Sequence, residues 1–295
     1  MSDIERFNER VGRLAIVGTG LLGGSLGLGL RAAGYAGSIV GVGRRQSTLD
    51  AALAGNCIDQ GTTDVGEAAA ACDLIVLGTP LGTFAALLGQ IAEHDHDRLI
   101  ITDLGSTKQM VCADAARLLP RPARFVGSHP MAGGEQHGPQ HARGDLFKNK
   151  PCVITPVGET DRQARDLVID LWSLLGMRII EMSPAEHDRK VAAISHLPHA
   201  VAALLVKLAA KQNALPLAST GFGDTTRVAS GDPTVWADIF TANREEVAEL
   251  IGRMQVELGA LGEIIAAGDH DRIADAMAEA KQCRDEWIDK LNEGE

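Results

Sequence analysis

A glycine-rich segment near the N-terminus constrains the fold of this chain more than any other feature. Residues 18–23 read GTGLLG, a G-x-G-x-x-G pattern that directly follows the apolar run 14–17 and opens an apolar helical stretch. In this context the first glycine makes a tight turn, the second admits a pyrophosphate, and the third lets the helix pack closely on the sheet. The helix N-terminus then faces the phosphates. The pattern therefore predicts a dinucleotide-binding fold.

The residues after the second apolar run, 38–42, bear on the choice of dinucleotide. NAD-binding proteins usually place an acid at this strand end to hold the ribose hydroxyls. This chain has Gly43 there, followed by Arg44, Arg45 and Ser47. Arginine pairs with a 2′-phosphate that a carboxylate would repel, so we expect NADP, with NAD as the alternative. The residues expected to bind the cofactor are Gly18, Thr19, Gly20, Leu21, Leu22, Gly23, Arg44, Arg45, Ser47, Thr79 and Pro80.

Apolar runs alternate with helical stretches through the first 182 residues. The expected strands are 14–17, 38–42, 73–78, 99–103 and 124–127, with 152–155 and 178–182 extending the same sheet. Continuous apolar strands separated by helices are typical of a parallel sheet covered on both faces. We therefore predict an α/β fold class, with a Rossmann-type, doubly wound, dinucleotide-binding domain over residues 1–182.

The pattern becomes helical after residue 182. The segment SPAE at 183–186 offers an N-cap serine, a proline at the first helical position and a glutamate three residues after the cap. A long apolar stripe follows at a spacing of about 3.5 residues: Val247, Leu250, Ile251, Met254, Leu258, Leu261 and Ile265. Either an intramolecular core or a dimer interface would cover it. We predict an all-helical substrate and dimerisation domain over residues 183–295.

Composition and charge exclude several classes of protein. The chain has 295 residues, and 28 basic against 39 acidic side chains give a net charge of −11. Such an acidic chain is a poor binder of nucleic acid. Its five cysteines are scattered, as in a reducing compartment. The polar N-terminus is not a secretory signal, and no uninterrupted apolar run approaches about 18 residues. We expect a cytoplasmic protein with no membrane partner.

Two loops at the predicted sheet edge carry candidate catalytic groups. The segment DLGSTK follows the run 99–103, at the edge where doubly wound sheets bind ligands. Its Ser106 or Thr107 either caps the next helix or faces cofactor and substrate. In GSHPMAG, His129 stands between a strand end and a glycine-rich turn, a position that suits a general base near neutral pH.

Two further polar segments lie in the helical half. In SHLPH, His196 and His199 are three residues apart and share a helix face, so we expect at least one of them in the active-site wall. They lack a third ligand, and no metal is predicted. In GFGDTTR, Arg227 is suited to clamp a carboxylate, with Asp224 orienting it, unless the two form a surface ion pair. Trp236 of DPTVW either walls the same pocket or packs between domains.

Together these motifs resemble the prephenate/arogenate dehydrogenase family of tyrosine biosynthesis. The matching stretches run in family order from residue 14 to about 240: GTGLLGGS, DLGSTK, GSHPMAG, SHLPH, GFGDTTRVA and DPTVW. The resemblance implies a Rossmann domain, an all-helical dimerisation domain and a homodimer. It also implies an oxidative decarboxylation, in which hydride leaves the carbinol carbon of a cyclohexadienyl ring for the nicotinamide and the ring carboxylate departs as CO₂.

The resemblance implies a role for each candidate residue. The histidine matching His129 bonds the ring hydroxyl and takes its proton, and the serine matching Ser106 helps to orient that hydroxyl. The arginine matching Arg227 holds a substrate carboxylate. The positions of His196, His199, Asp224 and Trp236 line or support the pocket. Many relatives carry an acid where Gly43 stands, so this chain departs from their motif and its dependence on NAD does not follow from the resemblance.

Prephenate is the expected substrate, with arogenate, which differs by an amino in place of a keto group, as the nearest alternative. A 3-hydroxyacid dehydrogenase of similar architecture would rely on a catalytic lysine, and nothing in this sequence resembles its setting. A non-catalytic NADP sensor would need the glycine loop but would have no use for His129, Ser106 and Arg227 together. Absorbance at 340 nm with each substrate and cofactor separates these hypotheses.

Overall fold

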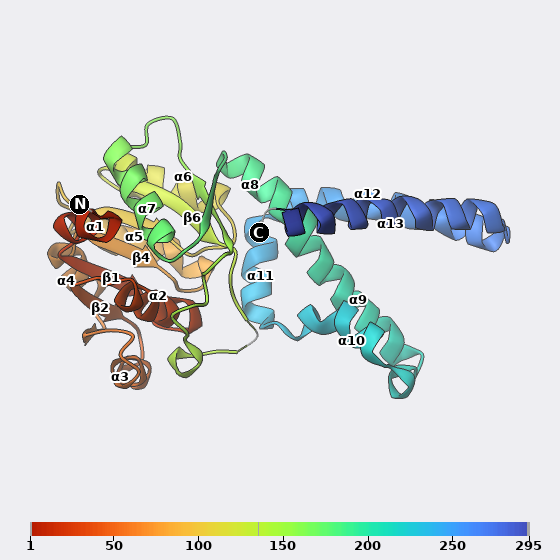
Figure 1. The fold of residues 1–295 in the computed structure, drawn as a ribbon, viewed down its shortest axis with the longest axis horizontal. Coiled ribbons are helices and arrows are strands. Elements are labelled where there is room, and N and C mark those ends of the chain that lie inside the picture. The colour runs from red at the N-terminus through yellow and green to blue at the C-terminus, as the bar shows by residue number, and fades with distance from the viewer. Residues whose placement is uncertain (1, 135, 294–295) are drawn as a thin grey trace. The chain divides into compact units, whose positions relative to one another are not determined.

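The chain forms two compact units in a computed structural model that describes residues 2–134 and 136–293 (Figure 1). The first unit comprises residues 1–244 and contains the whole sheet, and the second comprises residues 245–295. The predicted domain boundary at 182/183 falls between strand β8 (Arg178–Glu181) and helix α8 (Pro184–Val191), inside the first unit. That boundary stays a prediction.

The sheet of the first unit has eight strands among the described residues, in the order β3-β2-β1-β4-β5-β6-β7-β8. Their bounds are β1 (Arg13–Val17), β2 (Ser38–Val42), β3 (Gln60–Thr62), β4 (Leu74–Leu77), β5 (Ile100–Asp103), β6 (Phe125–Pro130), β7 (Pro151–Thr155) and β8 (Arg178–Glu181). The strands from β3 to β6 pair in parallel. The chain order reverses between β1 and β4, the point where doubly wound sheets bind ligands. The predicted fold class is confirmed.

Two details of the sheet differ from the sequence prediction. Strand β7 extends the sheet as expected but runs antiparallel to β6, so the expectation of a purely parallel sheet was wrong. Among the described residues between these strands, the only helical segment is the 3-10 turn η3 (Pro139–His141), whereas a parallel pairing needs a longer crossover, usually through a helix. Strand β3 was missed because its sequence, QGT, has no apolar run. It is a short edge strand, which needs little burial.

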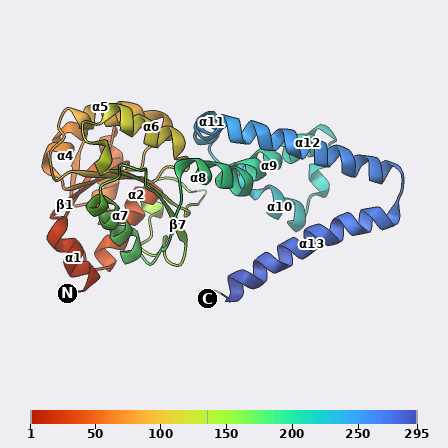
Figure 2. The same cartoon turned by 90° about the horizontal axis from the view of Figure 1, so that it is seen from above.

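Helices cover both faces of the sheet. Helices α1, α2 and α7 lie on one face and α4, α5 and α6 on the other (Figure 2). Successive residues of β1 alternate between the two faces, so Leu14 and Ile16 join Trp172 in one core while Ala15 and Val17 join Phe84 in the other. The helix bounds are α1 (Asp3–Arg10), α2 (Leu21–Ala32), α3 (Gln46–Ala54), α4 (Val65–Ala71), α5 (Phe84–Ala92), α6 (Gln109–Leu118) and α7 (Arg162–Leu174).

The helical part of the first unit begins as the sequence predicts. The Ser183 side chain accepts a hydrogen bond from the backbone N–H of Glu186 and starts α8. The helix continues through a π-helical turn, η4 (Ala192–His196), into α9 (Leu197–Lys211), followed by α10 (Thr220–Thr226) and α11 (Pro233–Ala242). By length and composition alone, the stretch Pro184–Lys211 is long and apolar enough to cross a membrane. Its first turns, however, carry the buried polar side chains of His187 and Asp188.

The second unit comprises residues 245–295, and its described part contains helix α12 (Arg244–Ala266) from residue 245 on and helix α13 (His270–Glu293). The predicted apolar stripe lies on α12. Within a single chain Val247 is buried, whereas Ile251, Leu258 and Ile265 are exposed. The single chain therefore leaves much of the stripe uncovered.

The glycines of α2 let this helix pack closely against the backbone of a neighbouring segment of the same chain. This close packing yields a stability prediction. A Cβ at Gly27 would overlap the carbonyl oxygen of Cys57, whereas a Cβ at Gly89, inside α5, would meet nothing within 4 Å. We expect Gly27→Ala to lower the free energy of unfolding by ~1–3 kcal/mol through overpacking. The matched Gly89→Ala should raise it by roughly 0.5–1 kcal/mol. Urea unfolding checks both values, and equal effects of the two variants would contradict the packing argument.

Candidate active site and cofactor cavity

Four strand ends meet at one edge of the sheet. Because β1, β4, β5 and β6 are parallel neighbours, their carboxyl ends lie side by side. The segments that leave these ends carry Gly18, Thr79 and Ser106, while His129 lies near the end of β6 itself. The sheet thus gathers residues that are more than 100 positions apart in the sequence.

The glycine turn after β1 requires its glycines. Gly18 has φ of 100°, and a Cβ there would lie 2.6 Å from the carbonyl oxygen of Gly78. A Cβ at Gly23 would collide with the backbone of Gly18. At Gly20, by contrast, a Cβ would meet nothing within 4 Å, and this N-cap residue of α2 provides no side-chain cap. The turn therefore leaves the start of α2 open to a ligand.

A cavity of about 840 Å³ lies against this turn. Most of the predicted cofactor residues line it: Gly18, Thr19, Gly20, Arg44, Arg45, Ser47, Thr79 and Pro80. Leu21, Leu22 and Gly23 are not among the lining residues. Leu21 and Leu22 pack against the core, and Gly23 packs against the glycine turn. The sequence motif marks both the residues that face the cavity and those that support it.

The polar groups of the cavity fit a dinucleotide phosphate. Arg44 and Arg45 are exposed at its wall. The buried Thr19 hydroxyl has no hydrogen-bond partner in the described part of the chain, so a ligand there would satisfy it. Sequence reasoning missed residues 137–140, which line the cavity from the loop between β6 and β7. No motif marks that loop as a ligand contact.

His129 stands at the centre of a buried cluster. It lies on β6, and its Nδ1 is 2.8 Å from Nε2 of His187. The Nδ1 of His187 is in turn 2.8 Å from Oδ1 of Asp188. Sequence reasoning missed His187 and Asp188, because they follow the SPAE helix start and look like ordinary residues of a surface helix. Both side chains are in fact fully buried.

The carboxylate of Asp188 also caps helix α6. Its Oδ1 accepts from the backbone N–H of Lys108 at 2.7 Å, and its Oδ2 accepts from that of Gln109 at 2.9 Å. The suggestion that Ser106 or Thr107 caps this helix is therefore wrong, since a carboxylate from α8 does so. Ser106 stays half-buried in the turn between β5 and α6.

A second buried charge fixes the turn that carries Ser106. Asp103 and Lys108 form an ion pair without exposed surface. The Asp103 carboxylate also accepts from the backbone N–H groups of Gly105, at 2.8 Å, and Ser128, at 3.0 Å. Breaking a buried ion pair by removing one partner costs about 3–5 kcal/mol. This network therefore holds the end of β5 rigidly beside the end of β6.

The helical part of the first unit supplies a further wall of the cluster. His199 stacks on Trp236 with ring centroids 3.4 Å apart. The Asn243 side-chain amide donates to the carbonyl of Asp188 at 2.9 Å, and its nitrogen lies 3.1 Å from His196 Nδ1. The ring atoms His196 Nε2 and His199 Nδ1 are buried without a partner among the described residues. Buried polar atoms are rarely left without a partner, so these two are candidates for a ligand contact.

The predicted residues Asp224 and Arg227 lie at the surface rather than in the buried cluster. Asp224 is exposed on α10, and Arg227 is exposed at the start of the 3-10 turn η6 (Arg227–Ser230). Asn243, which sequence reasoning missed, is buried instead. It follows the end of α11, and no motif marked it. Among the described residues, no group of three or more His, Cys, Asp or Glu side chains is placed to hold a metal ion.

Burial keeps the histidines of the cluster neutral. Desolvation, followed by the nearby charges of His187, Lys108 and His196, holds the pKa of His129 well below its usual range. Desolvation also lowers the pKa of His187 and lowers that of His196 to about 4. A neutral imidazole accepts a proton, so His129 is available as a base at neutral pH.

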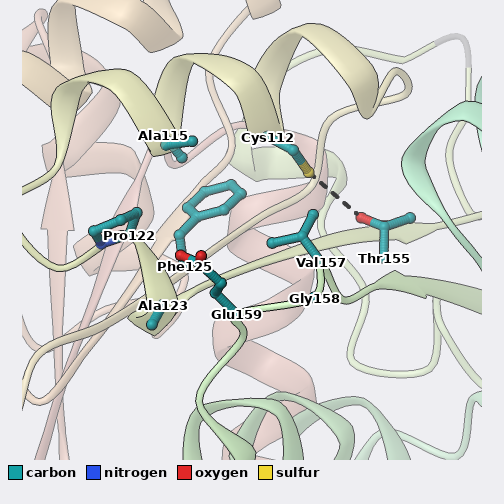
Figure 3. A pocket seen from close by; sticks show the side chains of 10 residues that line it. Cys112, Ala115, Pro122, Ala123, Phe125, Thr155, Val157, Gly158 and Glu159 are labelled. Carbon is teal, nitrogen blue, oxygen red and sulfur yellow. Dashed lines mark hydrogen bonds between the residues drawn. The ribbon is translucent and has the colours of Figure 1, made fainter.

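A second, smaller cavity differs in character. It has a volume of about 290 Å³ and lies between α6 and the strands β6 and β7 (Figure 3). Phe125 and Cys112 form part of its wall, and the Cys112 thiol lies 3.7 Å from Thr155 Oγ1. Burial raises the pKa of Cys112 to about 11, which keeps this thiol protonated at neutral pH. The catalytic candidates therefore belong to the sheet edge.

Two family models match the chain. The model for the prephenate dehydrogenase nucleotide-binding domain matches residues 26–181, and the model for the prephenate dehydrogenase dimerization domain matches residues 183–279. Among curated proteins, prephenate dehydrogenase of Bacillus subtilis is 32% identical over 285 residues, which cover 94% of this chain and 76% of the relative. Cyclohexadienyl dehydrogenase of Zymomonas mobilis is 31% identical over 277 residues, which cover 92% and 94%.

Solved structures are similar along nearly the whole chain. Prephenate dehydrogenase from Aquifex aeolicus, in complex with hydroxyphenyl propionate and NAD⁺, has a TM-score of 0.88 at 32% identity and covers 93% of this chain and 97% of its own. Arogenate dehydrogenase from Synechocystis has a TM-score of 0.80 at 30% identity and covers 93% and 99%.

The lowered pKa of His196 predicts an acid-sensitive fold. An unfolded histidine titrates near 6.5, so between that pH and about 4 the unfolded chain binds a proton that the folded protein excludes. Stability from this group is present above pH 6.5 and is lost as the pH falls toward 4. At pH 5 the loss amounts to about 2 kcal/mol. Urea unfolding at pH 7 and pH 5, at one protein concentration, measures it.

The variant His196→Asn keeps an acceptor for Asn243 but removes the titrating ring. On acidification from pH 7 to pH 5, its free energy of unfolding should fall by about 2 kcal/mol less than that of the parent protein. The exposed His270 provides the control, and His270→Asn should keep the full loss of the parent protein. An unchanged acid dependence in His196→Asn would show that this ring is not responsible.

Proposed function

This chain belongs to the prephenate dehydrogenase family, and we propose that it converts prephenate to 4-hydroxyphenylpyruvate in tyrosine biosynthesis, with hydride transfer to a nicotinamide dinucleotide. The observation that carries the proposal is the neutral, buried His129 at the same sheet edge as the cofactor cavity. A cofactor-binding protein without chemistry would not need a base at that place.

The reaction places few demands on the protein. Loss of hydride and CO₂ makes the ring aromatic, which supplies much of the driving force. The nicotinamide supplies the hydride acceptor. His129 takes the proton of the ring hydroxyl as the carbonyl forms, and the proton returns to the phenol oxygen after CO₂ leaves. Ser106, on the turn held by Asp103 and Lys108, orients the same hydroxyl. His129 is neutral again when the reaction ends.

The unpartnered polar atoms of the cluster indicate where the substrate would bind. We assign His196 Nε2 and His199 Nδ1 to the substrate, because buried polar groups are rarely left unpaired in native proteins. Trp236 supports His199 through their stacked rings. Arg227 is assigned to a substrate carboxylate and Asp224 to its orientation, since a guanidinium binds carboxylates in a planar, bidentate manner.

Arogenate is the second candidate substrate. It shares the reacting ring with prephenate and differs only in the amino group of its side chain. The similarity to cyclohexadienyl dehydrogenase of Zymomonas mobilis and to arogenate dehydrogenase of Synechocystis supports its inclusion. Parallel assays with the two substrates decide between them by their kcat/KM values.

We infer that NADP is preferred over NAD. The support is local: Gly43 stands where an acid would hold the ribose hydroxyls, and Arg44 and Arg45 line the cavity beside it. The Aquifex aeolicus relative has been solved with NAD⁺, so the preference rests on these residues of this chain. An added cation favours a 2′-phosphate, whereas loss of an acid alone only weakens the binding of NAD.

We also infer a cytoplasmic homodimer held largely by the helical half. The exposed apolar residues Ile251, Leu258 and Ile265 of α12 need a partner surface, and closed two-fold dimers are the commonest assembly. The match of residues 183–279 to a dimerization domain supports this assembly and a division of the chain into 1–182 and 183–295. We expect no nucleic-acid or membrane partner.

The substitution His129→Asn tests the proposed activity. It should lower kcat by ~10²–10⁴, the range for a positioned acid–base group, because no base then accepts the hydroxyl proton. Affinity for the cofactor should change little, because His129 is not among the residues that line the cofactor cavity. Absorbance at 340 nm with prephenate or arogenate measures turnover. Near-normal turnover would reject His129 as the base, and no turnover by the parent protein would reject the activity itself.

Replacing both Arg44 and Arg45 by alanine tests the cofactor preference. A charge-assisted pair contributes ~1.5–3 kcal/mol, or roughly 10–100-fold in the KM for NADP. The double variant should therefore lose most of its preference for NADP while its turnover with NAD is spared. Steady-state assays with each cofactor at saturating substrate provide the comparison. If the parent protein already favours NAD, the two arginines are only solvated surface charges.

A further inference from the structure

We propose that His187 and Asp188 are positioning residues that hold His129 in one tautomer, with its proton on Nδ1 and a lone pair on Nε2. The inference rests on the proposed role of His129 as the base and names the nitrogen that acts. Both residues lie on α8, are fully buried and are absent from the lining of the cofactor cavity. His187 contacts His129 directly, so we expect its effect on the reaction to pass through that ring.

The tautomer of His187 follows from the hydrogen bonds that the Asp188 carboxylate accepts. Backbone N–H groups can only donate, and those of Lys108 and Gln109 point at Oδ1 and Oδ2 of Asp188. Both carboxylate oxygens therefore act as acceptors. His187 Nδ1, which lies 2.8 Å from Oδ1, must then carry the proton of that ring. In a neutral imidazole the other nitrogen, Nε2, is left as an acceptor.

The same argument passes from His187 to His129. Nε2 of His187 is an acceptor and lies 2.8 Å from Nδ1 of His129, so His129 must donate from Nδ1. Its Nε2 then carries the lone pair and can accept a proton from the substrate. The two rings meet edge to face, with centroids 5.0 Å apart. A rotation of the His129 ring that exchanged its two nitrogens would therefore break the hydrogen bond to His187.

The charged and titratable groups around the two rings fit this arrangement. They come from every neighbouring element: Asp103 on β5, Lys108 at the start of α6, Cys152 on β7, Asp188 on α8 and His196 on η4. Lys108 is bonded to Asp103, which leaves the Asp188 carboxylate to face His187. When His129 takes up a proton, its positive charge lies one ring away from that carboxylate. A buried carboxylate that orients a histidine base acts in the same way in hydrolase triads.

The tautomer can be measured directly on the free protein. Long-range ¹H–¹⁵N correlation spectra of protein labelled with ¹⁵N-histidine distinguish an Nδ1–H from an Nε2–H ring, and the His129→Asn spectrum assigns the signal. We expect His129 to be an Nδ1–H tautomer, and we expect both tautomers in His187→Phe. A proton on Nε2 of His129 in the parent protein would overturn the proposal. This measurement needs no substrate, so it stands even if the proposed activity fails.

Kinetics test whether His187 acts through His129. His187→Phe should lower kcat roughly 10²-fold, within the range for acid–base groups, with the KM for the cofactor unchanged. His187→Gln keeps an acceptor oxygen and should recover part of the loss. In a His129→Asn background, His187→Phe should lower kcat no further, because the base it positions is already gone. An equal loss in both backgrounds would refute the positioning role, and the exposed His270→Gln serves as the control for histidine replacement.

Discussion

The buried carboxylate of Asp188 is the contact on which much of the site depends. Its oxygens cap the start of α6 and hold His187, and the carbonyl of the same residue accepts from Asn243. A buried charge is tolerated only when it is fully hydrogen-bonded, because desolvation otherwise costs several kcal/mol. The carboxylate therefore joins a sheet crossover helix to the first helix after the sheet, and the backbone carbonyl of the same residue joins the end of α11. Through His187, the same carboxylate orients His129.

The cofactor cavity depends on a different constraint, which is space. Parallel strands bring Gly18 and Gly78 so close that a side chain at Gly18 would collide with the neighbouring backbone. The glycine turn leaves the start of α2 without a side-chain cap, and Arg44 and Arg45, which follow β2, line the wall of the cavity. The cavity and the histidine cluster thus lie at the same edge of the sheet, as hydride transfer between cofactor and substrate requires.

Local patterns predicted most of the architecture. The apolar runs marked every strand except β3, whose short sequence buries no apolar side chain. The glycine pattern marked the cofactor turn, and SPAE marked the start of α8. Sequence reasoning was wrong about the direction of β7, and one of its two alternatives for Ser106 and Thr107, the cap of α6, is not what the structure shows. Both depend on contacts between segments far apart in the chain, so no local pattern carries them.

The sequence by itself determined the class of fold, the place of the glycine turn and the candidate base, because strand periodicity, glycine spacing and a histidine at a strand end are local features. Only the tertiary structure decided which groups surround that base. His187 and Asp188 look like residues of an ordinary surface helix in the sequence, and Asn243 has no motif at all. Their roles arise because folding buries these residues, 58 to 114 positions after His129 in the chain, where a polar group must find a partner.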